Sequence, residues 1–509
     1  MNTSLIKSTI IISLMTCSFK ILGFVKQAFI AYYYGANANT DVYFVAEGFI
    51  VGLSTALAKA FAVSLVACYA YVLINKGRKF SNILLSNMMT FFLPVSSFAA
   101  FLMFFYAPHL ARLLAPAFTE KQYLSLVEYL KFLSPLVILI VIFSLLSAAL
   151  DAEKKFIPAR LHSLFTSIFL IAACVFLSKS YGLQGLIFAQ YLSYLFILVI
   201  VFYSLSKNYK YSFHNPLKDE NVFRVFRTAF PLIIGNATLQ INQIVNKIIA
   251  SGLNSGVVSS LSYAQVLDQF VTSVLLVNAG NLLFANFAIL VAQNKESEVK
   301  DTLIHFMNVI IIIMVPISII TCMLSREIVS IVYLRGSFSY NAVNMTSLAL
   351  IGYAIGFPIV AFRDLLIKSM YAYSDTKTPM VNGVISILFN ILFCVVLSKY
   401  IGVIGITLSS TIAALIAAVL SYFSFKKHVP DFSFSVFRNT FGKIILSGIL
   451  SIIIIYSLRM SFSNNTSVII LFILLALVGF VSYFTAMYFL KCEEVIFYIN
   501  LLRKRLGNL

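Results

Sequence analysis

The sequence predicts an all-α polytopic membrane protein with about fourteen transmembrane helices. We expect two six-helix lobes related by a parallel repeat, followed by two C-terminal helices. Three observations lead to this prediction. The 509 residues are 61% hydrophobic and only 11% charged, whereas soluble domains have about 25% charged residues. The apolar residues form continuous runs long enough to cross a bilayer, and two loops recur about 220 residues apart.

A transmembrane helix needs about 20 predominantly apolar residues. The runs are continuously apolar, whereas strands of an outer-membrane barrel alternate with a period of two, so we expect helices. The longest polar connections lie near 206–222 and 426–439, which leaves no room for an extramembrane domain. The runs cover residues 8–34, 42–73, 84–110, 127–150, 158–178, 184–205, 223–252, 260–292, 303–325, 343–370, 380–399, 403–425, 440–459 and 466–490.

Lysine and arginine predict the orientation. With the N-terminus placed in the cytoplasm, 23 of the 37 basic residues fall in cytoplasmic loops and 8 fall outside. This excess follows the positive-inside rule, so we expect a multi-pass protein of the bacterial cytoplasmic (inner) membrane with both termini in the cytoplasm. The same rule explains the net charge of +19, and we expect no nucleic-acid partner.

Two pairs of loops indicate an internal duplication. Residues 150–158 and 372–379 are acidic–basic loops that end in a proline at a helix start, and residues 177–185 and 397–405 share a Leu-Ser-Lys start and two glycines. Parallel repeats build transporters with a site between the two halves. We therefore predict an N-lobe at 1–222 (helices 1–6), a C-lobe at 223–437 (helices 7–12), and helices 13–14 with a cytoplasmic tail at 438–509.

Three lysines lie within predicted spans: Lys20 and Lys26 in the first and Lys59 in the second. A charge at the bilayer centre costs about 2.5–3.5 kcal/mol even on the insertion scale, so these side chains are not expected to face lipid. We interpret them as the lining of a water-filled cavity that attracts an anion. The alternative is a buried pair, for example with Asp41 or Glu47, or snorkelling to an interface.

Two other charged positions have a structural alternative to ligand binding. Asp41 opens the second span, where a carboxylate can cap the helix and complement its dipole. In the tenth span, Asp364 and Lys368 are four residues apart and can pair on one helix face. Lys368 is also a candidate for contact with a ligand.

Polar side chains form a stripe on the seventh span, and a second stripe follows on the eighth. We interpret the two stripes as walls of a wet cavity, with hydrogen bonding between helices as the alternative. The first stripe comprises Asn236, Gln240, Gln243 and Lys247, and the second comprises Gln265, Asp268, Gln269 and Thr272.

The sequence contains no GxxxxGK[ST] and no HExxH motif, and its histidines are isolated. The first absence excludes an ATP motor of the P-loop type, and the second excludes that kind of zinc hydrolase. A membrane enzyme of polysaccharide assembly would need acids or bases gathered on a sizeable loop, and none is present. We therefore expect a transporter without a cofactor and no enzymatic activity, with a polymerase as a rival hypothesis.

Several segments resemble one known family. They read LGFVKQA at 22–28, YGA at 34–36, TDVYFVA at 40–46, AS at 250–251, LSYA at 261–264, LRGSF at 334–338 and YAYSDTKTP at 371–379. These segments are similar to those of the MurJ/MviN lipid II flippases, in the multidrug/oligosaccharidyl-lipid/polysaccharide exporter superfamily. The resemblance covers nearly the whole chain.

The resemblance implies a flippase that carries an undecaprenyl-pyrophosphate-linked saccharide, the peptidoglycan precursor lipid II, from the inner to the outer leaflet by alternating access. It implies that Lys20, Lys26, Lys368 and Asp41 lie at positions that face the substrate. Some members also bind sodium, and Asn246, Asn390 and Ser410 fall near those positions. We expect a monomer whose partners are the lipid-linked saccharide and the bilayer.

The chain departs from the family at several positions. Lys59 is a single base where the family has paired arginines, Gln265 and Val266 replace an Asp-Arg pair, and Asn246 and Cys394 replace the sodium carboxylates. Flipping of an O-antigen, capsule or exopolysaccharide unit therefore remains an alternative. A multidrug exporter is a further alternative, although such a protein would need acids in the cavity.

Overall fold

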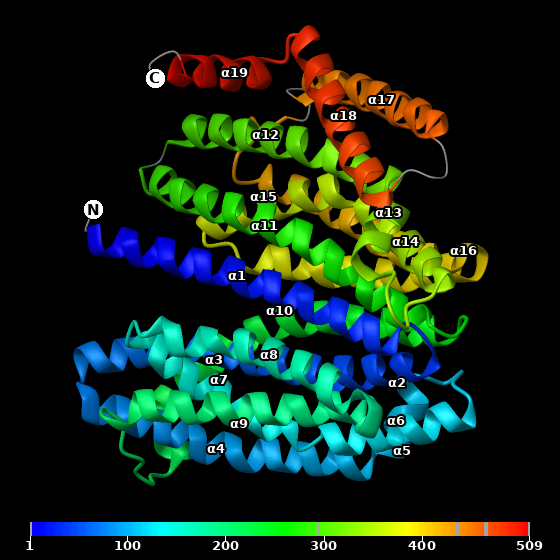
Figure 1. Cartoon of the computed structure of the whole chain (residues 1–509). Coiled ribbons are helices and arrows are strands. Elements are labelled where there is room, and N and C mark those ends of the chain that lie inside the picture. Colours follow the sequence, from blue (N-terminus) through cyan, green and yellow to red (C-terminus); the bar gives the residue numbers. More distant parts are fainter. Residues whose placement is uncertain (1–2, 294, 434–436, 463–466, 507–509) are drawn as a thin grey trace. The chain divides into compact units, whose positions relative to one another are not determined.

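The computed structural model describes residues 3–293, 295–433, 437–462 and 467–506, and every regular element in these ranges is a helix (Figure 1). The chain forms two compact units. Unit 1 comprises residues 1–262 and 335–342, and unit 2 comprises residues 263–334 and 343–509. An all-helical chain is expected in a bilayer, because a helix satisfies its own backbone hydrogen bonds where no water is available.

Unit 1 contains ten α-helices with one π-helical and one 3₁₀ segment, among the residues that the structure describes. They are α1 (Thr3–Tyr34), α2 (Ala38–Glu47), η1 (Gly48–Gly52), α3 (Leu53–Asn75), α4 (Arg78–Phe105), α5 (Ala107–Leu114), α6 (Glu120–Leu133), α7 (Leu136–Ala152), α8 (Phe156–Tyr181), α9 (Gln184–Ser206), η2 (Pro216–Lys218) and α10 (Glu220–Ser251).

Unit 2 begins inside α11, whose first residues belong to unit 1, and also takes in most of α14. Its core is built from side chains of α11, α12, α15 and α16 and of the segment that follows α16. The elements are α11 (Val257–Ala292), α12 (Glu296–Met323), α13 (Ser325–Tyr333), α14 (Tyr340–Ala354), α15 (Phe357–Ala372), α16 (Lys377–Phe425), α17 (Arg438–Ser461), α18 (Val468–Phe489) and α19 (Glu493–Leu506).

Nine helices in the described ranges are long and apolar enough to cross a membrane. The pair α14 and α15, which is bent by 44°, raises the number to ten if it forms a single broken span. The prediction of an all-helical polytopic membrane protein is therefore confirmed.

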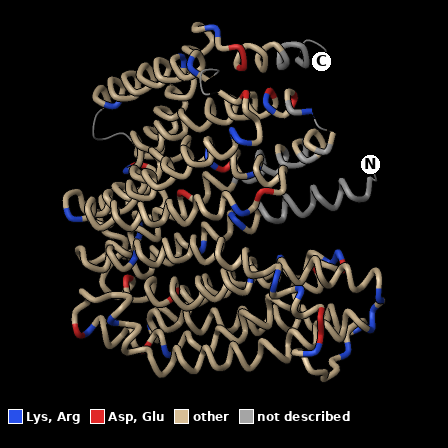
Figure 2. The backbone as a smooth tube through the Cα atoms, turned by 180° about the vertical axis from the view of Figure 1, so that it is seen from behind, with Lys and Arg blue, Asp and Glu red and all other residues tan. Residues whose placement is uncertain are grey.

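The connections of unit 1 gather at two opposite ends. At one end Arg78 Nη1 lies 2.7 Å from Glu153 Oε1, and Asn82 Nδ2 donates to the Asn208 carbonyl, so the loops before α4, after α7 and after α9 lie together. At the other end the Tyr34 hydroxyl donates to the Gly182 carbonyl. Figure 2 shows basic positions mainly at helix ends and few inside the spans.

The basic residues are unevenly divided between these two ends, as the charge count along the sequence predicts. The end with Glu153 has many more of them than the end with Gly182. The first set is Lys76, Arg78, Lys79, Lys154, Lys155, Arg160, Lys207, Lys210, Lys218, Arg224 and Arg227, and the second is Arg112, Lys121, Lys131, Lys179 and Arg335.

The two duplicated loops have the same backbone conformation. Lys154 and Ser374, 220 residues apart, have φ values of 62° and 60°. The amide of the next residue then donates back to the carbonyl of Leu150 in one loop and of Met370 in the other. This left-handed residue and its backward bond are a common way to end a helix.

The second pair of loops agrees as closely. Gly182 has φ 52° and ψ −136°, and Gly402 has φ 60° and ψ −136°. Residues with a side chain rarely adopt these backbone angles, so glycine is favoured at both positions. Gly402 divides α16 into two helices that correspond to α8 and α9.

We predict that Glu153→Gln destabilises unit 1 at neutral pH. Burial alone would raise the pKa of Glu153, but Lys155 and Arg78 outweigh it and lower the pKa below the ordinary 4.5. A depressed carboxyl pKa adds stability above that ordinary value, and this stability is lost as the pH falls through the folded pKa. Because both partners are partly exposed, the loss should be about 1 kcal/mol.

Thermal unfolding of the purified protein in detergent at pH 7 and at pH 4 would measure this effect. The variant should unfold at a lower temperature at pH 7, and the difference should shrink at pH 4. Glu298→Gln is the matched control, because it removes only an exposed pair with Lys295 on one helix. An equal shift at the two pH values would contradict the prediction.

Candidate functional site

Asp41 belongs to α2, but its carboxylate binds the first amides of α11. A different residue caps α2. Asn37 caps α2 in a capping box with Thr40, so the expectation that Asp41 caps its own helix is wrong. The Asp41 carboxylate is 2% exposed and accepts from the Gly256 amide at 2.6 Å and the Ser259 amide at 2.7 Å. The Ser259 hydroxyl lies 2.5 Å from the same carboxylate.

This contact has a clear physical reason. The first amides of a helix have no partner within that helix, and the helix dipole favours a negative charge at this end. Asp41 supplies both an acceptor and a charge to α11 from more than 200 residues away in the chain. It therefore holds the end of unit 1 at which α2 and α11 begin.

Two glycine-containing segments meet at the end of α1. The Ser337 amide donates to the Tyr32 carbonyl at 2.8 Å, and the Ser337 hydroxyl donates to the Tyr33 carbonyl at 3.1 Å. Gly35 and Gly336 both have positive φ, and a Cβ on either would collide with the backbone of the other segment. The YGA and LRGSF segments that carry the family resemblance therefore contact one another.

A π-helical turn interrupts the second span. Lys247 Nζ donates to the Phe44 carbonyl at 2.8 Å, and Gln240 Nε2 donates to the Gly48 carbonyl at 3.0 Å. Each carbonyl has two lone pairs, so it accepts this second donor where α2 passes into η1. A Cβ on Gly48 or Gly52 would collide with the Lys247 or Gln240 side chain. Gln240 and Lys247 thus join α10 to the second span, as the hydrogen-bonding alternative requires.

Glu47 is the last residue of α2. It attracts both Lys26 and Lys247 electrostatically, while Lys26 also repels a charge on His162. His162 packs against the rings of Phe143 and Tyr194, with centroids 4.6 and 4.4 Å away. Two lysines of unit 1 therefore share Glu47, while Asp41 is bonded at the start of α11.

The other lysines predicted in these spans lie in a different setting. Lys20 and Lys59 are exposed, and none of the ion pairs in the described part of the chain includes them. Asn236 and Gln243, on the α10 stripe, are partly exposed. These side chains remain candidates for contact with a ligand.

In unit 2 the charges of α15 pair differently from the prediction. Arg363 Nη2 lies 2.8 Å from Asp364 Oδ1, and Asp364 also attracts Lys368. Arg363 also attracts Asp268 of α11. Gln265 lies one turn before Asp268 and is partly buried.

The residues predicted near a sodium ion fall in both units. Asn246 is buried in unit 1, while Asn390 Nδ2 donates to Ser410 Oγ at 3.0 Å in unit 2. The Asn390 side-chain oxygen has no hydrogen-bond partner among the residues that the structure describes, and the residue one turn later is the buried Cys394. The set therefore offers neutral oxygens, with Cys394 where a carboxylate was expected. The ranges described contain no group of three or more His, Cys, Asp or Glu suited to a metal.

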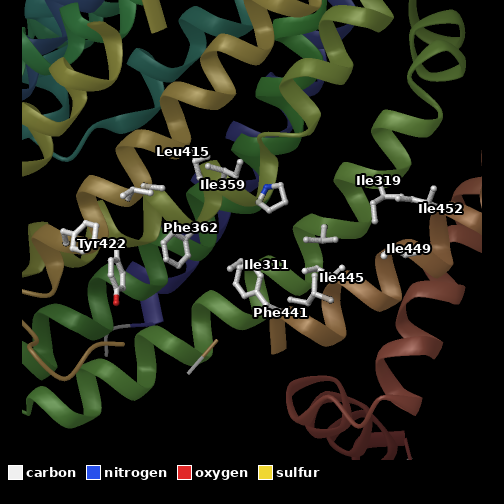
Figure 3. A pocket seen from close by; sticks show the side chains of 17 residues that line it. Ile311, Ile319, Ile359, Phe362, Leu415, Tyr422, Phe441, Ile445, Ile449 and Ile452 are labelled. Atoms are coloured by element: carbon white, nitrogen blue, oxygen red, sulfur yellow. The ribbon is translucent and has the colours of Figure 1, made fainter. Parts of the chain in front are cut away.

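Unit 2 contains an apolar cavity of about 650 Å³ among α12, α15, α16 and α17 (Figure 3). Isoleucines and aromatic rings dominate its lining, as Ile311, Phe362 and Ile445 illustrate. Such a surface suits a hydrocarbon chain and offers nothing to a charged headgroup.

The sequence reasoning missed three features of unit 1. Glu47 was named as a possible partner of the lysines in the first two spans, but its attraction to Lys247 was missed because that lysine is 200 residues away. The sequence contains one signal for the π-helical turn, which is the pair Gly48 and Gly52 in a span whose other side chains are mostly larger. His162 looked isolated because its neighbours come from other helices.

The sequence comparisons agree over nearly the whole chain. A family model described as lipid II flippase MurJ matches residues 30–477. The "probable lipid II flippase MurJ" of Buchnera aphidicola subsp. Schizaphis graminum is 26% identical, over 99% of this chain and 100% of that protein. A protein of the same description from Treponema pallidum is 23% identical, over 84% and 82%.

Solved structures share the fold. A structure described as "Lipid II flippase MurJ, inward closed conformation" has a TM-score of 0.80 and 23% identity, over 97% of this chain and 100% of that one. An inward-facing multidrug resistance transporter of the MATE family has a TM-score of 0.70 and 13% identity, over 81% and 95%.

We predict that Asp41→Ala destabilises the protein more than Ser259→Ala. The first change leaves two buried amides without an acceptor, at about 1–3 kcal/mol each, whereas the second keeps both amide bonds. Thermal unfolding in detergent would compare the two variants with the parent. Equal shifts would show that the amide contacts of Asp41 contribute little.

We also predict that Gly52→Ala weakens the contact between α10 and η1, because the new methyl group would displace the Gln240 amide. Gly23→Ala is the control, since a Cβ there meets no atom within 4 Å. A double-mutant cycle with Gln240→Ala would test the cause. The double variant should unfold at the same temperature as Gln240→Ala alone, and additive losses would contradict the collision.

Proposed function

The chain belongs to the MurJ family of lipid II flippases, and on this premise we propose that it moves lipid II across the bacterial cytoplasmic membrane. The substrate is an undecaprenyl-pyrophosphate-linked saccharide, taken from the inner leaflet and released to the outer leaflet by alternating access. As a member of a transporter family, the protein is not an enzyme.

The observation that carries the proposal is the excess of basic groups in unit 1. Lys20, Lys26 and Lys59 lie in membrane helices, and Glu47 is the one carboxylate that interacts with them or with Lys247 among the residues described. A pyrophosphate needs cationic partners when it leaves water, because a bare charge in hydrocarbon is costly. We assign the three lysines to substrate binding, with Lys368 as a further basic contact from unit 2.

The apolar cavity of unit 2 supports the lipid part of the same proposal. A polyprenyl chain has no polar group to satisfy, and the cavity walls are hydrocarbon (Figure 3). The membrane potential is a suitable driving force, because moving one charge through it releases about 2.3 kcal/mol per 100 mV. We derive no step through sodium.

We further propose fourteen crossings with both termini in the cytoplasm. The nine long helices and the bent pair supply ten of them. The break at Gly402 makes α16 two crossings, and α1, α10 and α11 supply three more. The basic end of unit 1 then faces the cytoplasm. In this proposal the protein works as a monomer with lobes at 1–222 and 223–437.

Two alternative substrates are those of other members of the same superfamily. A polyprenyl-linked unit of O-antigen, capsule or exopolysaccharide would use the same basic groups and the same apolar cavity. A multidrug exporter shares the fold, but organic cations would be repelled by the interior of unit 1.

The test is rescue of a strain depleted of its own lipid II flippase. Growth and the exposure of lipid II at the outer leaflet would be read together, with the inserted amount of protein measured in each case. We expect the parent chain to rescue. Lys20→Ala and Lys59→Ala should lower lipid II exposure about 10- to 100-fold, since a contact to a charged group contributes about 1.5–3 kcal/mol.

Lys20→Arg should retain function if charge alone is required, and Lys179→Ala removes an exposed charge elsewhere as the control. Normal flux in both alanine variants would overturn the role of the lysines. Failure of the abundant, inserted parent chain would overturn lipid II as the substrate, and export of capsule or exopolysaccharide would then be assayed.

A further inference from the structure

The connection between α9 and α10, residues 207–219, lies along the first turns of α4 (Figure 1). Hydrogen bonds fix it there. The Asn208 carbonyl accepts from Asn82 at 2.9 Å, and the hydroxyl of Tyr209 lies 3.0 Å from that of Ser86. The Ser212 amide donates to Ser86 Oγ at 3.2 Å. This connection, the 207–219 segment, is therefore a fixed part of the surface of unit 1.

The two ends of the contact give its extent along α4. The hydroxyl of Tyr211 lies 2.8 Å from that of Thr90, and Asn87 donates to the Asp219 carboxylate at 2.8 Å. Residues 82–90 of α4 span about 12 Å at 1.5 Å per residue. The 28 residues of α4 measure about 42 Å, so a centred helix extends about 6 Å beyond each side of a hydrocarbon core of about 30 Å. The contact starts about 6 Å from the first residue of α4, so the 207–219 segment lies at the boundary between headgroups and acyl chains and reaches inward along α4.

The outward side of the segment is aromatic and basic. Tyr211 is 57% exposed, Phe213 75% and Leu217 64%, while Lys207, Lys210 and Lys218 are also exposed. The one acid in the segment, Asp219, is engaged by Asn87 and by the start of α10. These lysines form no ion pair within the described ranges. Exposed rings beside such charges fit an interface in which rings enter the acyl region and ammonium groups meet phosphates.

We propose that the 207–219 segment is a binding surface for anionic phospholipid headgroups of the membrane that contains the protein. The lysines attract the headgroup phosphates, and the rings of Tyr211 and Phe213 insert beside them. The hydroxyl of Tyr211 is already bonded to α4, so the ring presents its apolar face at no cost in hydrogen bonding. This surface is independent of the transported substrate.

The sequence contains no tryptophan, so Phe213→Trp creates a protein with one fluorescent indole. The full chain would be reconstituted in nanodiscs of phosphatidylcholine with increasing phosphatidylglycerol, and brominated lipids would measure the depth of the indole. We expect stronger quenching by bromines near the glycerol than by bromines deep in the chains. Tyr106→Trp, at the opposite end of α4 and also exposed, provides the control.

Charge dependence would be measured as enrichment of fluorescent phosphatidylglycerol around the indole. Replacement of Lys207, Lys210 and Lys218 by Gln should lower the enrichment by up to about fivefold for each lysine removed. The matched control replaces Lys121, Lys131 and Lys179 at the other end of unit 1. The proposal requires a loss that is specific to the first set.

Three results would overturn the proposal. An indole that brominated lipids do not quench would place the segment in water. An equal loss of enrichment in both triple variants would reduce the effect to overall charge. Abolition of the enrichment by soluble pyrophosphate, with lipid in excess, would show a site for free phosphates in place of a lipid surface.

Discussion

Every backbone polar group inside a bilayer needs a partner within the protein, and the interior of unit 1 depends on how this constraint is met where helices begin or change pitch. At the start of α11 the partner is the Asp41 carboxylate. Where α2 becomes η1, the carbonyls of Phe44 and Gly48 accept from Lys247 and Gln240. Some polar side chains of the spans are thus hydrogen-bonded to backbone groups, and only the others remain for binding a ligand.

The difference between lysines that are bonded to backbone and lysines that are not changes how their charges should be interpreted. Lys247 is bonded to a carbonyl and attracted by Glu47, and Lys26 shares the same carboxylate at longer range. Lys20 and Lys59 have no such partner among the residues described, so they carry the uncompensated charge. Lysine is a compact point charge and lacks the two-pronged fork of arginine. Two separate lysines therefore suit an anion that must be attracted without being held in a single fixed pose.

The helices, the basic ends of unit 1 and the duplicated loops could be predicted from the sequence, because each depends on neighbouring residues. Continuous apolar runs specify helices, and Gly182 and Gly402 mark turns that other residues rarely adopt. The pairing of charges could not be predicted, because its partners are distant in the chain. Asp41 contacts Ser259, and Asp364 pairs with Arg363 even though Lys368 has the better sequence spacing. The side-chain rotamers that choose between such partners leave no trace in local composition.

The duplicated loops share their backbone conformation but not the side-chain contacts that hold it. The bend at Lys154 and the bend at Ser374 have the same backbone angles, because the next helix must start in the same direction in both copies. The groups that fix each bend are different. Glu153 is held by the permanent charges of Arg78 and Lys155. At the second bend Asp375 lies 3.1 Å from His428. Although burial opposes it, hydrogen bonds from Thr378 and His428 lower the Asp375 pKa. Two copies with one backbone therefore differ in their partners, since two cationic side chains hold Glu153 and a single imidazole faces Asp375.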